Sequence, residues 1–537
     1  MKALLMHRDR DFDPQRLLSR REKESRFRRS DQTSSLDQLL PWNERALRQD
    51  LGLDVVFREM ARGDAFLFEV AQVGVLSSVI DPDTIRYRQD ILEDCSRNEP
   101  IVRDMYALAI EAIERERKEH FGFLTRSPGL ILYRSVETMK MFTAMLRRLR
   151  DMADRHAEQF ASEGLSRLCS MLRQELSDEY FDQIDDHLRR LRFRRGVLIS
   201  ARLGKANKGT NYVLRRPHGE DRNWLSRLLS WSSAERYSYQ LHPRDEAGAR
   251  ALSGLRDQGI NLVANALAQS TDHILSFFEM LRTELAFYIG CLNLRRRLDE
   301  LGQPTCFPRA APVGDRALSF SGLSDAALAL CAGNRLVANE LVADGRDLFV
   351  IMGANSGGKS TFLRSVGQAQ LMMQAGMFVT AASFAAEVRD GLLTHFKREE
   401  DAAMESGKLD EELKRMSEII DHAAPNSIVL FNESFAATNE REGSEIAHQI
   451  TTALVGCGIK VFFVTHLYEF AFRLRETAPD TIFLNAERRS DGKRTFRIVA
   501  GEPSETSYGR DLYARVFGSE CAPGDASESR EPVRLSI

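Results

Sequence analysis

Cysteine is scarce in this sequence and nowhere forms a metal-binding or redox pattern. The 537 residues include seven cysteines, and no two of them stand in a CxxC pair. A small secreted scaffold held by disulfides and a cysteine-rich zinc site are therefore excluded. We expect reduced thiols, as in a cytoplasmic protein.

Long apolar runs are also missing. No uncharged apolar stretch approaches the roughly 18–20 residues that a membrane-spanning helix needs. The N-terminal residues MKALLMHRDRDFD become polar after six residues, so they lack the apolar stretch of a secretory signal peptide. These absences predict a soluble, cytoplasmic protein without a membrane partner.

The chain has almost no excess of one charge, since 75 Lys and Arg residues stand against 78 Asp and Glu residues. The basic residues are nevertheless concentrated locally, because residues 189–222 hold eleven Lys or Arg and two acids. Screening limits the reach of each charge to about 10 Å, so this segment keeps a positive field of its own. A hydrophobic fraction of 43% excludes a disordered or collagen-like chain.

Local composition divides the chain into four parts. Residues 1–44 are polar and predict an arm without stable structure, and residues 519–537 predict a loose tail. Residues 45–302 are helical by pattern, with a β-containing insertion near 190–245 where two β-prone runs flank GKANKG. Residues 303–518 alternate short apolar runs with helical stretches, which indicates a mostly parallel sheet covered by helices. The expected strands are 348–352, 428–431, 461–465 and 481–484.

One helix of the second part stands out by its length. From residue 261 to 300, apolar residues recur at alternating steps of four and three (Leu267, Thr271, Ile274, Phe278, Leu281, Leu285, Tyr288 and Leu292). Forty residues of helix extend about 60 Å, which suits a strut or lever. The alternative is that Gly290 divides the stretch into two ordinary helices.

A phosphate-binding pattern follows the first apolar run of the third part. Residues 348–361 read LFVIMGANSGGKST, which is a strand, the P-loop motif GxxxxGK[ST] and the start of a helix. Backbone N–H groups of such a loop face phosphate oxygens, the lysine reaches the β- and γ-phosphates, and the serine hydroxyl holds Mg²⁺. A chance match on a glycine turn is disfavoured by the strand before it and the helix after it. The sequence predicts ATP and Mg²⁺ as cofactors, bound through Gly353, Ala354, Asn355, Ser356, Gly357, Gly358, Lys359, Ser360 and Thr361.

Two later strands deliver polar residues to the edge where ligands bind in such sheets. The run SIVLF ends in Asn432 and Glu433, and the run VFFVT ends in His466. Glu433 is the predicted base that polarises the attacking water, and His466 has the position of a γ-phosphate sensor. Asn432 is the predicted metal ligand together with Ser360, although P-loop ATPases usually have Asp there. The alternatives are a glutamate that caps a helix and a structural histidine.

Together these segments resemble the MutS family of mismatch-repair ATPases. The resemblance is carried by GANSGGKSTFLRSVGQAQLMMQAGMFV, FNESFAATNEREGSEIA and FFVTHLYEFA, and more weakly by residues 81–90 and the 260–300 helix. The implied fold class is multidomain: an all-α core and lever domain with a clamp-like β insertion, followed by an α/β P-loop ATPase domain of the ABC-like type. The resemblance also implies contact of Asn339 with the nucleotide and a homodimer in which Ser406 approaches the ATP of a second subunit.

Two departures from the family pattern bear on function. The chain shows no counterpart of the N-terminal mismatch-reading domain, which suggests a truncated relative. Asn432 in place of Asp suggests slow hydrolysis, because the metal loses one nearby negative charge.

These features favour an ATP-switched dimeric clamp that binds double-stranded or branched DNA without reading its sequence, in DNA repair or recombination. The alternatives are a nucleotide-controlled protein scaffold and an RNA- or ribosome-associated ATPase. The predicted DNA contacts are the basic residues of the insertion, for which a solvated basic face is the alternative: Arg194, Arg195, Arg202, Lys205, Lys208, Arg215 and Arg216.

Overall fold

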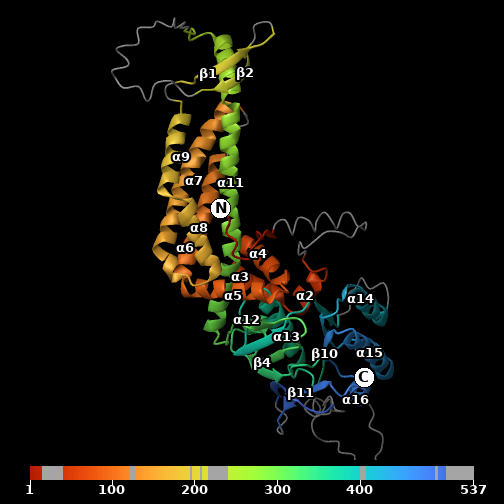
Figure 1. The fold of residues 1–537 in the computed structure, drawn as a ribbon. Helices are drawn as coiled ribbons and strands as arrows, with labels where there is room; N and C mark the ends of the chain where they lie inside the picture. The colour runs from red at the N-terminus through yellow and green to blue at the C-terminus, as the bar shows by residue number, and fades with distance from the viewer. Residues whose placement is uncertain are drawn as a thin grey trace, which may run out of the picture. The chain divides into compact units, whose positions relative to one another are not determined.

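The computed structural model describes residues 1–14, 40–120, 127–193, 196–205, 209–215, 240–398, 407–489 and 494–503. The chain divides into two compact units (Figure 1). The first unit takes its residues from 1–40, 59–74 and 86–294, and the second from 41–58, 75–85 and 295–537.

Helices dominate the first 300 residues. They are α2 (Glu44–Asp50), α3 (Leu53–Ala61), α4 (Ala65–Leu76), α5 (Pro82–Arg97), α6 (Glu99–His120), α7 (Pro128–His156), the 3₁₀ turn η1 (Ala157–Gln159), α8 (Glu163–Glu175), α9 (Asp178–Leu191) and α11 (Glu246–Glu300). The predicted helical character of this N-terminal region is therefore confirmed for the described residues.

Helix α11 is continuous over 55 residues, or roughly 80 Å at 1.5 Å per residue. The predicted seam is buried from Thr271 to Leu292, because α7 and its neighbours lie alongside it (Figure 1), and the rings of Phe142 and Phe278 stack at 5.8 Å. Gly290 does not interrupt the helix. A Cβ at Gly290 would lie 3.3 Å from the side chain of Met60, so this glycine permits close packing.

Residues 1–14 differ from the unstructured arm expected over 1–44. The Glu284 carboxylate is fully buried on α11 and accepts hydrogen bonds from the backbone N–H groups of Leu5 and Met6. The Arg88 side chain, also fully buried, donates to Met6 O over 2.8 Å. Two buried charges need partners, and the N-terminal backbone supplies them. Residues 15–39 of the expected arm lie outside the described residues.

The β-containing insertion is a two-stranded ribbon. Strands β1 (Ile199–Leu203) and β2 (Gly209–Leu214) pair antiparallel, with Ile199 opposite Leu214 and Leu203 opposite Gly209. The ribbon therefore matches the hairpin predicted from the two β-prone runs.

The second unit contains a six-stranded sheet in the order β12-β11-β6-β10-β9-β8. All neighbouring pairs are parallel except β11 and β12. The strands are β6 (Leu348–Met352), β8 (Leu392–Phe396), β9 (Ile428–Asn432), β10 (Lys460–Val464), β11 (Ile482–Arg488) and β12 (Arg494–Ala500). The four predicted strands correspond to β6, β9, β10 and β11, while β8 and β12 were not predicted.

Helices cover both faces of this sheet. One face packs Val350, Phe431 and Phe463 against α14 (Lys408–His422), α15 (Glu440–Gly456) and α16 (Tyr468–Thr477). On the other face lies α13 (Lys359–Gln374), where a Cβ at Gly367 would meet Leu430 at 2.8 Å. Apolar residues therefore fill both faces of the strands, as expected for a parallel sheet inside an α/β unit.

A smaller four-stranded sheet in the order β3-β7-β4-β5 belongs to the same unit. Its strands are β3 (Arg309–Ala311), β4 (Leu318–Leu323), β5 (Asn339–Val342) and β7 (Ser383–Glu387), and α12 (Ala326–Ala332) follows β4. The sequence patterns did not predict this sheet.

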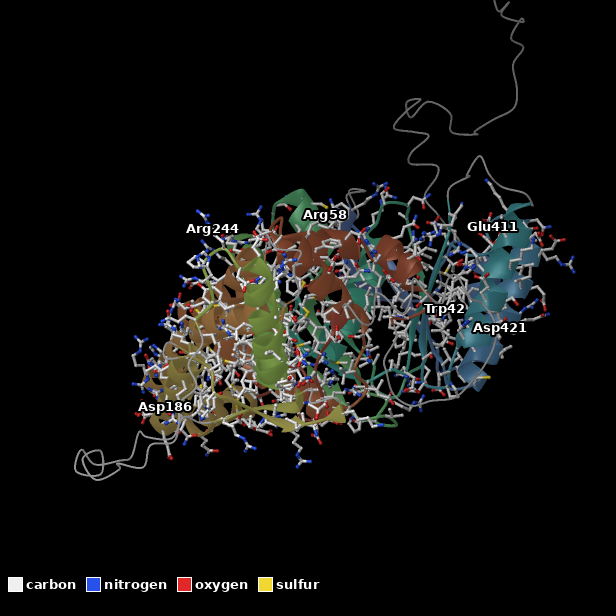
Figure 2. The ribbon with its side chains drawn as sticks, turned by 90° about the horizontal axis from the view of Figure 1, so that it is seen from above. Trp42, Arg58, Asp186, Arg244, Glu411 and Asp421 are labelled. Atoms are coloured by element: carbon white, nitrogen blue, oxygen red, sulfur yellow. The ribbon has the colours of Figure 1, made fainter. Side chains whose placement is uncertain are left out.

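Residues 41–58 also pack in the second unit, although the expected helical domain included most of them. Gln368 of α13 donates a 2.8 Å hydrogen bond to Leu51 O, and the indole of Trp42 stacks on His422 at 4.3 Å. Figure 2 shows Trp42 beside α14, the helix that carries His422 together with Glu411 and Asp421. These contacts bring an N-terminal segment to the sheet that holds the candidate site.

Among the described residues, no helix combines the length and the apolar character needed to cross a bilayer.

Candidate functional site

The loop between β6 and α13 contains backbone conformations with positive φ angles, which glycine adopts easily. Gly353 and Gly358 have φ angles of +109° and +95°, which side chains rarely tolerate. Lys359, the first residue of α13, folds back over the loop and donates to Gly353 O over 2.9 Å and to Ala354 O over 3.1 Å. Burial lowers the pKa of Lys359. The ammonium thus lies against the loop, where it can meet an anion.

Two oxygen-bearing side chains meet beside this loop. The Ser360 hydroxyl donates to Asn432 Oδ1 over 2.8 Å, which joins the start of α13 to the end of β9. Adjacent ligands of an octahedral Mg²⁺ with bonds of 2.0–2.1 Å lie about 2.9 Å apart, and Mg²⁺ prefers oxygen donors. The separation and the chemistry of these two side chains therefore fit the metal role predicted for them.

The candidate base and sensor are neighbours at the same sheet edge. Glu433 follows β9 and its backbone N–H donates to Val464 O over 2.9 Å, just before His466. His466 Nε2 lies 3.6 Å from Glu433 Oε1 and 3.3 Å from Lys359 Nζ. The nearby His466 imidazole lowers the pKa of the Glu433 carboxyl, so Glu433 stays ionised at neutral pH. One ring nitrogen therefore stands between a cation and a carboxylate.

The turn after Glu433 is held in an unusual backbone conformation. Glu433 and Phe435 have φ angles of +55° and +61°, which cost free energy in non-glycine residues. The fully buried His395 contacts the Ser434 hydroxyl through Nδ1 over 2.7 Å and Glu412 O through Nε2 over 3.0 Å. Burial lowers the pKa of His395 to about 4, so this histidine is neutral. Glu412 also accepts from the N–H of Phe435 over 2.9 Å.

Sequence reasoning missed His395 and Glu412. A histidine inside the apolar run LLTHF was the available signal, because a buried polar side chain needs partners. These two residues position the turn that carries Glu433.

The structure brings Lys359, Ser360, Asn432, Glu433 and His466 together. Asn355 and Ser356 are exposed on the loop, Ala354 and Gly357 are buried in it, and Thr361 is half-buried in α13. Asn339 Oδ1 accepts a hydrogen bond from the N–H of Ile498 over 2.8 Å. Ser406 lies outside the described residues.

Three of the predicted DNA-binding residues are described, and they lie in the first unit. Arg202, Lys205 and Arg215 are exposed on or beside the ribbon, and Arg215 donates to Ser200 Oγ over 2.8 Å. Arg194, Arg195, Lys208 and Arg216 lie outside the described residues. The described cations are thus available to an anionic partner.

Comparison with known families matches both halves of the chain. The family model described as MutS2 N-terminal domain matches residues 80–301, and the model described as MutS domain V matches residues 349–517. The second match contains the loop, Asn432, Glu433 and His466.

Curated relatives share the same name, DNA mismatch repair protein MutS. The protein of Thermotoga neapolitana is 35% identical over 190 residues, which cover 35% of this chain and 23% of the relative. The protein of Lactobacillus delbrueckii subsp. bulgaricus is 30% identical over 266 residues, 46% of this chain and 31% of the relative. The aligned part thus spans less than a third of each of these relatives.

The two family models cover separate parts of one chain, and the relatives align with it at 30% identity or more. The resemblance read from the sequence motifs is confirmed, and this chain belongs to the MutS family.

Proposed function

We propose that this protein is an ATP-hydrolysing DNA-binding protein, an ATP-switched dimeric clamp that acts in DNA repair or recombination. The observation that carries the proposal is the contact of one histidine with both charged residues of the site. His466 Nε2 lies 3.3 Å from Lys359 Nζ and 3.6 Å from Glu433 Oε1. The names of the curated MutS relatives support the DNA repair role.

Lys359 and the loop bind the triphosphate. The loop N–H groups and the positive end of α13 attract phosphate oxygens, and the Lys359 ammonium adds a full charge. The Lys359 ammonium donates to two loop carbonyls, which hold it against the loop where phosphate would bind. Mg²⁺ held by Ser360 and Asn432 would offset the negative charge on the phosphoryl oxygens.

Glu433 orients and deprotonates the attacking water. A carboxylate with a lowered pKa remains ionised at neutral pH, as a general base must be. The turn after it is held by His395 and Glu412, which limits the movement of the carboxylate. Such fixed positioning contributes to phosphoryl transfer, in which the protein mainly orients groups and stabilises charge.

His466 senses the γ-phosphate. Without a proton, His466 Nε2 accepts a hydrogen bond from the Lys359 ammonium. With a proton, Nε2 donates a hydrogen bond to the Glu433 carboxylate. A phosphate that recruits Lys359 frees Nε2 for another partner. Phosphate binding at Lys359 is thus linked to the hydrogen bonding of His466, which lies two residues after β10.

The ribbon binds the nucleic-acid backbone. Exposed Arg and Lys side chains contact phosphates without reading bases, and each neutralised phosphate releases counterions. Arg202, Lys205 and Arg215 are exposed there. We expect binding that weakens steeply with salt and depends little on base sequence.

The test is salt-dependent binding to a branched DNA, a linear duplex and a structured RNA of equal length. The triple variant Arg202→Ala, Lys205→Ala, Arg215→Ala should lose DNA affinity and show a smaller salt slope, by about 0.9 for each lost contact. The control triple Arg97→Ala, Arg115→Ala, Lys118→Ala removes the same charge from exposed ion-paired sites and should match wild type.

Three outcomes separate the candidate functions. DNA binding that the ribbon triple weakens supports the proposal. Preference for structured RNA would favour an RNA- or ribosome-associated ATPase. Absence of binding to any nucleic acid, with ATP binding intact, would favour a nucleotide-controlled scaffold.

A further inference from the structure

The β11–β12 hairpin lies directly against the phosphate loop. A Cβ at Gly357 would lie 2.7 Å from Ala486 Cβ, and a Cβ at Gly353 would lie 3.0 Å from the backbone nitrogen of Ala486. On β12, Phe496 O lies 3.3 Å from the Cβ position of Gly358. The loop glycines thus permit close approach of the hairpin as well as the backbone turn.

The hairpin is also anchored on both strands. β11 pairs with β6, the strand that leads into the loop. β12 is tied to β5 by the 2.8 Å hydrogen bond from the Ile498 N–H to Asn339 Oδ1. The start of β12 therefore has a defined position relative to the loop.

Arg494 is the first residue of β12 and its side chain is exposed. Its guanidinium makes no ion pair or hydrogen bond with any residue of the described part of the chain. Arg494 pairs directly with Arg488 across the hairpin, and like charges directly opposite one another repel. On β11, Arg488 lies two residues beyond Ala486, which packs against Gly353 and Gly357, so the Arg488–Arg494 pair lies next to the phosphate loop.

We propose that Arg494 is a phosphate-binding residue of the nucleotide site, supplied by the same subunit that supplies the loop. The inference rests on the proposed binding of ATP at Lys359. The like charges of Arg488 and Arg494 repel one another beside the loop, and a bound phosphate would reduce that repulsion. The guanidinium fork matches phosphate oxygens, with two parallel N–H donors.

Arg497 is the matched control. It lies three residues further along β12 and is also exposed, without a side-chain ion pair or hydrogen bond to a described residue. Arg494→Ala and Arg497→Ala therefore remove the same charge from the same strand, and only Arg494 is proposed to contact the nucleotide.

The experiment is calorimetric titration of the full chain with a non-hydrolysable ATP analogue and Mg²⁺. Wild type is compared with Arg494→Ala, Arg494→Lys, Arg497→Ala and Lys359→Ala, and the thermal unfolding of each is measured. We expect Arg494→Ala to weaken affinity roughly 10- to 100-fold, the range for one charge-assisted hydrogen bond. Arg494→Lys should recover part of that loss, Arg497→Ala should stay within about twofold of wild type, and unfolding midpoints should agree.

Equal affinities of Arg494→Ala and Arg497→Ala, with the analogue lost only in Lys359→Ala, would overturn the Arg494 role and leave the ATP site standing. Equal losses in both arginine variants would also overturn it, because they would reflect net charge alone. Absence of analogue binding by wild type, or full binding by Lys359→Ala, would overturn the proposed function and the Arg494 role together.

Discussion

The Ser360 hydroxyl donates a 2.8 Å hydrogen bond to Asn432 Oδ1, so the residue that departs from the usual P-loop ATPase pattern is joined to the first turn of α13. An amide oxygen performs here the acceptor role that a carboxylate oxygen could also perform. The side chains of Asn and Asp have the same shape and differ by one charge. Changing Asn432 to Asp therefore isolates the charge.

Asn432→Asp should lower the Mg²⁺ requirement and raise turnover. One charge near the metal contributes on the order of 1–3 kcal/mol, roughly 5- to 150-fold in affinity or rate. The measurement is steady-state ATP hydrolysis across a Mg²⁺ titration for both forms. Identical curves would show that another acid already supplies the charge. Glu399, Glu400 and Asp401 are candidates by sequence, and they lie outside the described residues.

Lys359→Ala should weaken ATP binding by about 10- to 150-fold, because a charge-assisted phosphate contact contributes roughly 1.5–3 kcal/mol. Equilibrium binding of a fluorescent ATP analogue measures this. Lys414→Ala, which removes an exposed lysine paired with Asp410 on α14, is the control and should bind as wild type does. Full binding by the Lys359 variant would remove the basis for the phosphate-loop assignment.

Glu433→Gln should keep ATP binding and reduce hydrolysis by about 10²- to 10⁴-fold, the usual contribution of a general base. Single-turnover hydrolysis, measured beside nucleotide affinity, separates the two effects. Glu476→Gln is the control, since Glu476 is exposed in the last turn of α16, ten residues after His466. Turnover close to wild type in Glu433→Gln would exclude Glu433 as the base.

Acidification should destabilise the first unit through His7. Arg88 Nη2 lies 3.0 Å from His7 Nε2, and burial, with the charges of Arg88 and Arg10, lowers the His7 pKa to about 3. The unfolded chain takes up a proton below about pH 6.5, whereas the folded chain does not, so the free energy of unfolding falls as pH falls through this range. Between pH 7.5 and 5.5 this group alone should remove about 1.4 kcal/mol.

Denaturant unfolding at both pH values, for wild type and His7→Gln, measures the His7 contribution. Glutamine offers Arg88 an acceptor and does not titrate. The variant should lose less stability than wild type on acidification. The same pH dependence in both forms would contradict the assignment of a neutral His7.

The protein should form a homodimer, at least with ATP. The family resemblance implies that Ser406 completes the site of a second subunit, so an isolated chain would hold only part of the site. Light scattering with and without ATP, at several concentrations, measures the mass. A monomer under every condition would contradict the clamp proposal, whereas an ATP-dependent dimer would support it.

The sequence predicted those elements whose patterns are local. β6, β9 and β10 are continuous apolar runs. Lys359 begins the helix after β6, Asn432 ends β9, and His466 follows β10 by two residues. The four-stranded sheet escaped prediction because its strands are short and only partly buried, as in Arg309–Ala311. β8 contains the polar pair Thr394 and His395, whose burial depends on contacts far along the chain.

Tertiary contacts account for the other differences. Residues 1–14 read as polar, yet their backbone satisfies the buried Glu284 and Arg88. Arg494 carries no motif at all. Its position next to the phosphate loop arises because β12 returns beside the loop, which sequence spacing alone does not reveal.

The register between β9 and β10 sets which changes of length the site can tolerate. Asn432 pairs with Val464, and the Glu433 N–H donates a hydrogen bond to Val464 O. Glu433 and His466 are therefore aligned with each other through backbone groups alone. Side chains in α15 can vary without changing that alignment, and a residue inserted into the turn at 457–459 leaves both strands paired. A single deletion within either strand would instead shift His466 relative to Glu433 by about 3.3 Å and reverse the faces of the side chains. Insertions and deletions should therefore be far more harmful within these ten strand residues, five in each strand, than in the helix and turn that connect them.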